Sequence, residues 1–189
     1  MKRHRFANFW IDGTRSLVNN TSLPKAIVEE EKARLREDLA ATHGVINVEE
    51  RLERYLEFNP PNLYILTEFH ELFQQIQDSY ISGYDYTALT GACCLGERIL
   101  NLLIIKTRRY YTQSKYYKRT YRKDSIQGWD LAIDSLSDWG ILKGDSIAKF
   151  KGLSKLRMLL CTTNLWETSG REHWLRFLLL QRLLTIFLD

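Results

Sequence analysis

Strand-like alternation of apolar and polar residues is nearly absent from this sequence, and proline and glycine are scarce inside its periodic segments. Apolar residues recur instead at the three- and four-residue spacing of helices, so we predict an all-α fold. Only three cysteines occur, and two of them, Cys93 and Cys94, are adjacent. Such a set makes no disulfide framework and is typical of a protein in a reducing cytoplasm.

Long hydrophobic runs are also missing from the sequence. The longest candidate, Trp174–Leu188, is interrupted by Arg176, Gln181 and Arg182, and falls short of the roughly 18–20 apolar residues that cross a membrane. The basic N-terminus, MKRHRFANFW, has no apolar core or small-residue cleavage site, which argues against a secretory signal. We therefore expect a cytoplasmic protein with no membrane partner.

Motifs for the common catalytic cofactors do not occur either. The sequence has no Gly-rich phosphate loop, Walker-type motif or GxSxG elbow. Its four histidines are scattered without ligand spacing. Asp130, Asp134 and Asp138 form an acidic stripe that is typical of a solvated helix face, and a metal site there is the weaker alternative. We expect no cofactor and no bound metal.

Proline, glycine and helix-capping residues divide the chain into predicted helical segments. The strongest helix-breaking signal is Asn59-Pro60-Pro61. We therefore predict an N-terminal helical arm over residues 1–60 and a helical bundle over residues 61–189. A turn is expected at Asp12-Gly13. The predicted helices cover about 22–42, 48–58, 62–81, 85–110, 126–139, a segment beginning at 145 or 146, and 170–188.

The segment 85–110 is the most regular of these helices. A polar stripe on it places a carboxylate and an amide, Glu97 and Asn101, beside apolar neighbours, where polar groups need partners. An arginine on a neighbouring helix is a common partner, whereas an exposed flank or a structural hydrogen bond is the alternative. The apolar stripe is Leu89, Ala92, Cys93, Gly96, Ile99, Leu100 and Leu103, and the polar stripe is Thr90, Glu97, Asn101 and Arg108.

Acidic residues are absent from Arg98 through Lys123. Within this stretch, the segment Lys106–Lys123, here called the basic connector, holds eight lysines or arginines and five of the ten tyrosines. Cations contact phosphates and tyrosines stack on unpaired bases, which predicts single-stranded RNA binding. The alternative is an exposed connector whose tyrosines pack back on the core. The predicted RNA contacts are Lys106, Arg108, Arg109, Tyr110, Lys115, Tyr117, Lys118, Arg119 and Arg122.

Four features in order, GERILN, the basic connector, WDLAIDSLSDWGIL and LSKLR, resemble the HEPN superfamily of small all-helical domains. The resemblance covers roughly Tyr84 to Arg157. Active members of that family are metal-independent endoribonucleases, often toxins or antiphage effectors, and usually work as dimers. The resemblance therefore implies catalytic roles for Arg157, Glu97 and Asn101, a homodimer, and a cognate antitoxin protein as a further partner.

The family's signature also needs a histidine, separated from the arginine by four to six residues. Here those positions hold Thr162, Thr163 and Asn164. An amide does not titrate, so Asn164 cannot act as a general base, whereas Arg157 keeps its ability to hold a phosphate. We therefore expect a chain that binds RNA without cutting it. A helical protein–protein interaction or dimerisation module with no RNA role is the alternative.

The composition of the chain changes after Arg157, where MLLCTTNLWE follows without the family's pattern. One hypothesis is a one-base shift of the reading frame at the Arg157 codon, which makes residues 158–189 a non-native tail. With codons chosen to fit, the neighbouring frame places a histidine within the family spacing. The DNA sequence beneath this region tests the hypothesis directly.

Overall fold

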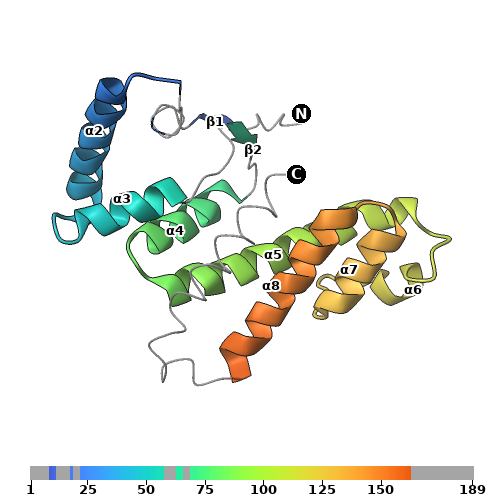
Figure 1. Cartoon of the computed structure of the whole chain (residues 1–189). Coiled ribbons are helices and arrows are strands. Elements are labelled where there is room, and N and C mark those ends of the chain that lie inside the picture. Colours follow the sequence, from blue (N-terminus) through green and yellow to red (C-terminus); the bar gives the residue numbers. More distant parts are fainter. Residues whose placement is uncertain (1–8, 12–17, 19–21, 58–62, 66–68, 163–189) are drawn as a thin grey trace, which may run out of the picture. The chain divides into compact units, whose positions relative to one another are not determined.

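Helices dominate the described part of the chain, which confirms the all-α fold class (Figure 1). The computed structural model describes residues 9–11, 18, 22–57, 63–65 and 69–162. One antiparallel pair of three-residue strands, β1 (Phe9–Ile11) and β2 (Leu63–Ile65), accompanies the helices. The turn predicted at residues 12–13 and the helix predicted over residues 170–188 lie outside the described residues.

The chain forms two compact units, which divide between Ala88 and Leu89. This division lies inside helix α5 (Asp85–Thr107) and not at Pro60-Pro61, where the sequence placed a domain boundary. Residues 58–62 are outside the described part of the chain, so a boundary there stays a prediction. Each unit has its own packing.

The first unit is built on a helical hairpin. Helix α2 (Lys25–His43) ends as predicted at Gly44, whose φ of 86° suits the left-handed conformation that glycine adopts at low cost. Helix α3 (Val48–Glu57) follows after a short loop, and α4 (His70–Ile81) packs on α3. The apolar core of this unit is Leu35, Leu39, Leu52 and Ile81, with Tyr55 and Leu56 packed against it.

The helix predicted over residues 62–81 is wrong in its first part. Leu63–Ile65 is strand β2, and α4 begins only at His70. A short apolar run such as this one fits a strand or a helix equally well by periodicity alone. The predicted end is confirmed, because Gly83 has φ 86° and the N–H of Tyr84 donates to the carbonyl of Ser79, as in a Schellman motif.

A buried arginine fastens α3 to the first turn of α5. The Arg54 side chain, 7% exposed, donates to the carboxylate of Asp85, to Glu50 and, at 3.1 Å, to the carbonyl of Tyr80. Burial alone lowers the pKa of Arg54, but the hydrogen bond and charge of Asp85, with the charge of Glu50, raise it above its ordinary value. The guanidinium therefore stays charged and joins three segments of the first unit.

In the second unit, helices α7 (Trp129–Asp138) and α8 (Gly144–Thr162) pack side by side (Figure 1). Leu153 of α8 packs on α5 at Cys93 and Gly96. Gly96 of α5 permits this approach, since a Cβ there would lie 2.7 Å from Cδ2 of Leu153 and 2.9 Å from the Trp129 ring. The core includes Leu89, Ala92, Leu95, Leu100, Ile104, Ile133, Leu136, Leu153 and Leu156.

The apolar stripe predicted on α5 belongs to this internal core. Leu89, Ala92, Cys93, Gly96 and Leu100 are buried within the structure, and the remaining two members are half-buried. The stripe therefore holds the second unit together. The homodimer that the resemblance implies stays a prediction.

The expectation that no segment is long and apolar enough to span a membrane is wrong for one helix. By length and composition alone, Asp85–Tyr110 meets that test, because the only charged residues in its centre are Glu97 and Arg98. Core helices of soluble proteins pass the same test, and 44% of the tested window is buried inside the structure. The structure is compatible with a soluble protein.

Candidate functional site

The polar stripe of α5 organises the segments that pack around it. Thr90, Glu97 and Asn101 lie within about 40° of arc on α5, because successive α-helical residues turn by roughly 100°, and Arg108 follows directly after the helix. Three of them make contacts to other segments of the second unit. The Thr90 hydroxyl is buried and has no hydrogen-bond partner within the described part of the chain.

Glu97 faces an arginine from a neighbouring helix, which confirms one of the two expectations for this carboxylate. Its Oε2 lies 3.5 Å from Nη2 of Arg157, so the pair joins α5 to α8. The two side chains are 30% and 44% exposed, respectively. Water therefore screens the pair, and an anion from solution has access to the guanidinium.

Asn101 uses its amide to hold the backbone of Ile126, which lies three residues before α7. Its Nδ2 donates to the carbonyls of Glu97 at 3.0 Å and Ile126 at 3.3 Å, while its Oδ1 accepts the N–H of Ile126. This is the structural hydrogen bond that was the alternative to a site role. The contact also explains why the helix predicted from Ile126 begins instead at Trp129, since the Ile126 backbone is committed to α5.

Arg108 holds the basic connector in shape. It lies at the start of the 3-10 helix η1 (Arg108–Tyr110), and its Nη1 donates to the carbonyls of Thr120 at 2.8 Å and Lys123 at 2.6 Å. Thr120 ends the short helix α6 (Tyr117–Thr120) and is fully buried. The guanidinium therefore closes the connector into a loop, so Arg108, predicted to contact RNA, has a structural role here.

The end of this loop contains a residue in a costly conformation. Arg122 has φ 67°, a left-handed value that costs a non-glycine residue about 1–2 kcal/mol. The bonds from Arg108 to the carbonyls on either side of this position compensate that cost. The Arg122 guanidinium lies 5.4 Å from the centre of the Tyr121 ring.

The tyrosines of the connector divide into two groups. Tyr111 stacks on Trp139 with ring centres 5.0 Å apart and planes 5° from parallel. It is half-buried, as are Tyr116 and Tyr117. Tyr110 is 68% exposed and Tyr121 is 48% exposed. Trp139 is itself buried, so Tyr111 packs against the core. For this tyrosine, the alternative to RNA contact is therefore confirmed.

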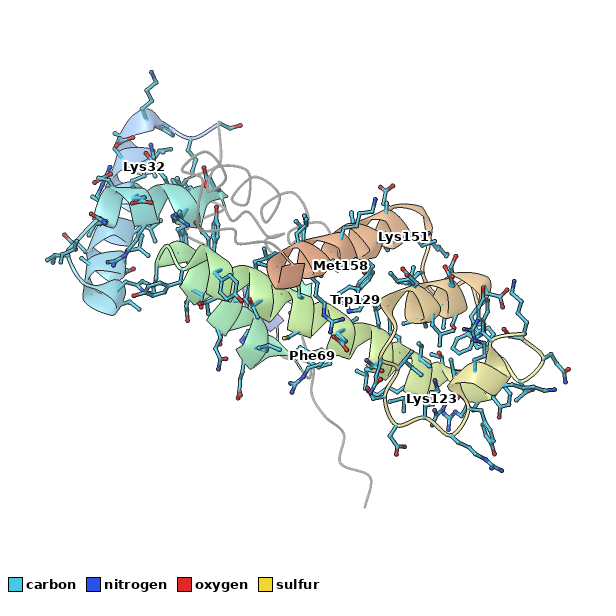
Figure 2. All side chains as sticks on the ribbon, turned by 90° about the horizontal axis from the view of Figure 1, so that it is seen from below. Lys32, Phe69, Lys123, Trp129, Lys151 and Met158 are labelled. Atoms are coloured by element: carbon cyan, nitrogen blue, oxygen red, sulfur yellow. The ribbon has the colours of Figure 1, made fainter. Side chains whose placement is uncertain are left out.

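Most cations of the connector are exposed, and several lie beside tyrosine rings. The charged groups of Arg109 and Lys115 lie 4.7 Å and 4.9 Å from the centres of the Tyr110 and Tyr116 rings. Figure 2 shows the side chains around Lys123 projecting outward from the ribbon. The exposed cations are Lys106, Arg109, Lys115, Lys118, Arg119, Arg122 and Lys123.

Some contacts of this region have no signal in the sequence. The hydroxyl of Ser114 donates to the carboxylate of Asp138 at 2.7 Å, which ties the connector to the acidic stripe of α7. The three aspartates of that stripe are exposed, as predicted for a solvated face. Ser114 and Thr120 form hydrogen bonds with residues distant in sequence, Asp138 and Arg108, and no local sequence pattern predicts such bonds. Tyr121 is one of the five connector tyrosines, but its exposure follows only from the fold.

The predicted absence of a general base near Arg157 concerns residues beyond the described part, since Asn164 and His173 lie outside it. Two described histidines are in the first unit, where Nδ1 of His43 lies 3.2 Å from the hydroxyl of Ser82 and His70 begins α4. Among the described residues, no group of three His, Cys, Asp or Glu side chains is placed to hold a metal ion.

Comparisons with known proteins find no match to a family model, a curated protein or a solved structure. The similarity to the HEPN superfamily therefore depends on the sequence segments quoted above. The roles that it implies for Arg157, Glu97 and Asn101 stay predictions.

Proposed function

We propose that this protein binds RNA through the basic connector, as a HEPN-like cytoplasmic protein of a defence or toxin system that has lost its nuclease activity. The observation that carries the proposal is the connector itself. It has eight cations and no acid, most of those cations are exposed, and Arg108 holds the loop in one shape. A preformed cationic loop binds a polyanion without first having to become ordered.

Arg157 of α8 is a further exposed cation of the second unit. It is 44% exposed, and among the described residues its charged partner is the carboxylate of Glu97. A phosphate offers the guanidinium a bidentate contact that the 3.5 Å pairing with Glu97 lacks. Arg157 therefore supports RNA binding at a second point of the second unit.

Cleavage needs a base that the sequence does not supply. In an intact HEPN-like enzyme, a histidine would take the proton of a ribose 2′-hydroxyl while the arginine stabilises the charge on phosphorus. Here Thr162, Thr163 and Asn164 occupy the histidine positions. Without a titrating group at these positions, the protein binds RNA as a non-enzymatic member of its class.

The alternative is a helical interaction module with no RNA role, which would bind its partner through apolar faces. Most of the apolar stripe of α5 is buried within the second unit, which supports RNA binding over this alternative. A homodimer and an antitoxin complex stay predictions. Salt dependence separates the two functions, because phosphate binding weakens steeply with ionic strength and helix packing does not.

The proposal is tested by charge reversal at four exposed connector cations, Arg109, Lys115, Lys118 and Arg119, each changed to Glu. Arg108 is kept because it holds the backbone. Binding of a fluorescent single-stranded RNA, measured by anisotropy, should weaken by about tenfold or more, since several phosphate contacts are lost together. Helical content, measured by circular dichroism, should not change.

A matched variant reverses four exposed cations of the second unit that lie outside the connector: Arg98, Lys143, Lys151 and Lys155. It changes the net charge by the same amount, so it separates a local site from general attraction. We expect the matched variant to lose much less affinity than the connector variant. Equal loss in both variants, or no loss in the connector variant, would remove the connector as the RNA site.

A further inference from the structure

Most of the exposed tyrosine surface of the connector belongs to two residues. Tyr110 and Tyr121 are 68% and 48% exposed. The other three rings are half-buried: Tyr111 is stacked on Trp139, Tyr116 has Lys115 beside it, and Tyr117 packs against Tyr121. A base from a bound nucleic acid therefore has the greatest access to Tyr110 and Tyr121.

Each of these exposed rings has its own cation. The Arg109 guanidinium lies 4.7 Å from the centre of the Tyr110 ring and also donates to its hydroxyl. The Arg122 guanidinium lies 5.4 Å from the centre of the Tyr121 ring. A ring with an adjacent guanidinium offers one nucleotide both a stacking surface for its base and a partner for its phosphate.

Both exposed rings also belong to the loop that Arg108 closes. Tyr110 ends η1, two residues after Arg108, and Tyr121 lies between the two carbonyls that Arg108 binds, those of Thr120 and Lys123. Tyr121 gains further support from Tyr117, whose ring centre is 5.0 Å away. The rings are therefore fixed on a short framework, which reduces the entropy lost when a base stacks on them.

We propose that Tyr110 and Tyr121 are stacking platforms for unpaired bases, so that the ligand of the connector is single-stranded RNA and not a duplex. This inference rests on the proposed function and names the class of ligand. Bases in a duplex are already stacked on one another and show only their edges in the grooves. Unpaired bases present their faces, and stacking on an aromatic side chain accepts any base.

The test replaces both tyrosines by alanine and measures binding of a single-stranded RNA of about 12 nucleotides, a length in the usual range for one such site. The Tyr110→Ala/Tyr121→Ala variant should bind about tenfold or more weakly, because each stacked base contributes strongly to binding. The Tyr110→Phe/Tyr121→Phe variant keeps the rings and should bind within about threefold of the unchanged protein. The same RNA annealed to its complement should bind more weakly than the single strand.

Two exposed tyrosines of the first unit provide a matched control. Tyr84 and Tyr86 are 66% and 48% exposed, nearly the same as Tyr110 and Tyr121, but lie outside the connector. Their replacement by alanine should leave RNA affinity unchanged. The base-stacking inference is overturned if the connector alanine variant binds normally, if the phenylalanine variant loses as much as the alanine variant, or if duplex binds as tightly as single strand.

These outcomes differ from those that test the proposed function. If the alanine variant binds normally while the four-charge connector variant fails to bind, RNA is held by its phosphates alone, and only the stacking inference is lost. If the four-charge variant binds normally as well, the connector is not the RNA site and both proposals fail. Single-stranded DNA of the same sequence should also bind, because base stacking on an aromatic ring does not require the ribose 2′-hydroxyl.

Discussion

Glu97 of α5 and Arg157 of α8 face each other with 3.5 Å between Oε2 and Nη2, and both side chains are partly exposed. An exposed pair of this kind contributes about 0–1 kcal/mol to folding, because water screens the charges. The pair is therefore too weak to explain how α8 packs on α5, which Gly96 and Leu153 explain better. Its more important consequence is that Glu97 competes with a phosphate for the Arg157 guanidinium.

The first prediction concerns this pair and RNA. Glu97→Gln removes a negative charge and frees Arg157, so RNA affinity should rise by about two- to fivefold. Arg157→Ala removes a phosphate contact, so affinity should fall by a similar factor. Anisotropy at two salt concentrations measures both changes. A fall in affinity for Glu97→Gln would contradict the proposal that Arg157 is available to a phosphate.

The second prediction concerns the ion pair of the first unit, which differs from the pair above in burial. The Arg54 side chain is 7% exposed and contacts Asp85, Glu50 and the Tyr80 carbonyl. Arg54→Met removes the charge and leaves Asp85 without its partner, so the free energy of unfolding should fall by about 3 kcal/mol. Urea denaturation measures the change, and Arg36→Met, which breaks an exposed pair with Glu49, is the control with an expected loss below about 1 kcal/mol.

The sequence predicted the helices well where their ends carry a strong signal. Gly44, Gly83 and Gly140 all have positive φ values and follow helices that were predicted to end there. The sequence-based prediction failed for Leu63–Ile65, because a short apolar run has no unique period. It also failed for the start of α7, because Asn101 on a distant helix binds the backbone of Ile126. The contacts that decided both cases are tertiary.

The candidate site shows the same division. The composition of the basic connector and the pairing of Glu97 with an arginine were predictable from charge and helical spacing. The role of Arg108 was not, because its partners are backbone carbonyls of Thr120 and Lys123, which every sequence has. Exposure also separates Tyr121 from Tyr117, and only packing determines exposure.

The third prediction follows from the close approach at Gly96. Gly96→Ala places a methyl group 2.7 Å from the Leu153 side chain and 2.9 Å from the Trp129 ring, so α8 or the ring has to move. The gain in helix propensity from alanine offsets part of this cost, and the net loss of stability should be about 1–2 kcal/mol. Gly128→Ala is the control, because its Cβ meets only Leu131 at 3.7 Å and should leave the midpoint of thermal unfolding nearly unchanged.

The fourth prediction separates a positioning residue from a phosphate contact. Arg108 is bound to two carbonyls, whereas Arg109 is exposed beside Tyr110. Arg109→Ala should reduce the slope of log affinity against log salt by about 0.7, the value for one lost phosphate contact on a single strand. Arg108→Ala should lower affinity by loosening the loop, with faster hydrogen exchange at the Thr120 and Lys123 region and a smaller change in slope. Equal changes of slope would make Arg108 a direct contact.

The last prediction is that the chain does not cleave RNA. Arg157 has Glu97 as its charged partner, and the positions where the HEPN-like signature has histidine hold Thr162, Thr163 and Asn164. A carboxylate that is ion-paired to the arginine is a poor base for a ribose hydroxyl, and an amide cannot accept the proton at all. Incubation with labelled RNA should therefore give no metal-independent products, with or without EDTA.

Cleavage should return if a histidine is restored near Arg157. If a one-base shift at the Arg157 codon removed the histidine, a gene corrected by one base should encode it within the family spacing and yield an enzyme that is active in EDTA. Arg157→Ala in that corrected protein should reduce the rate by about a hundredfold or more, as expected for a lost catalytic group.

The DNA sequence tests the frameshift hypothesis before any enzyme assay. If no histidine-bearing frame lies beneath residues 158–189, the frameshift hypothesis is wrong, and the absence of a base is a property of this protein. Cleavage by the unaltered chain would instead show that another residue supplies the base.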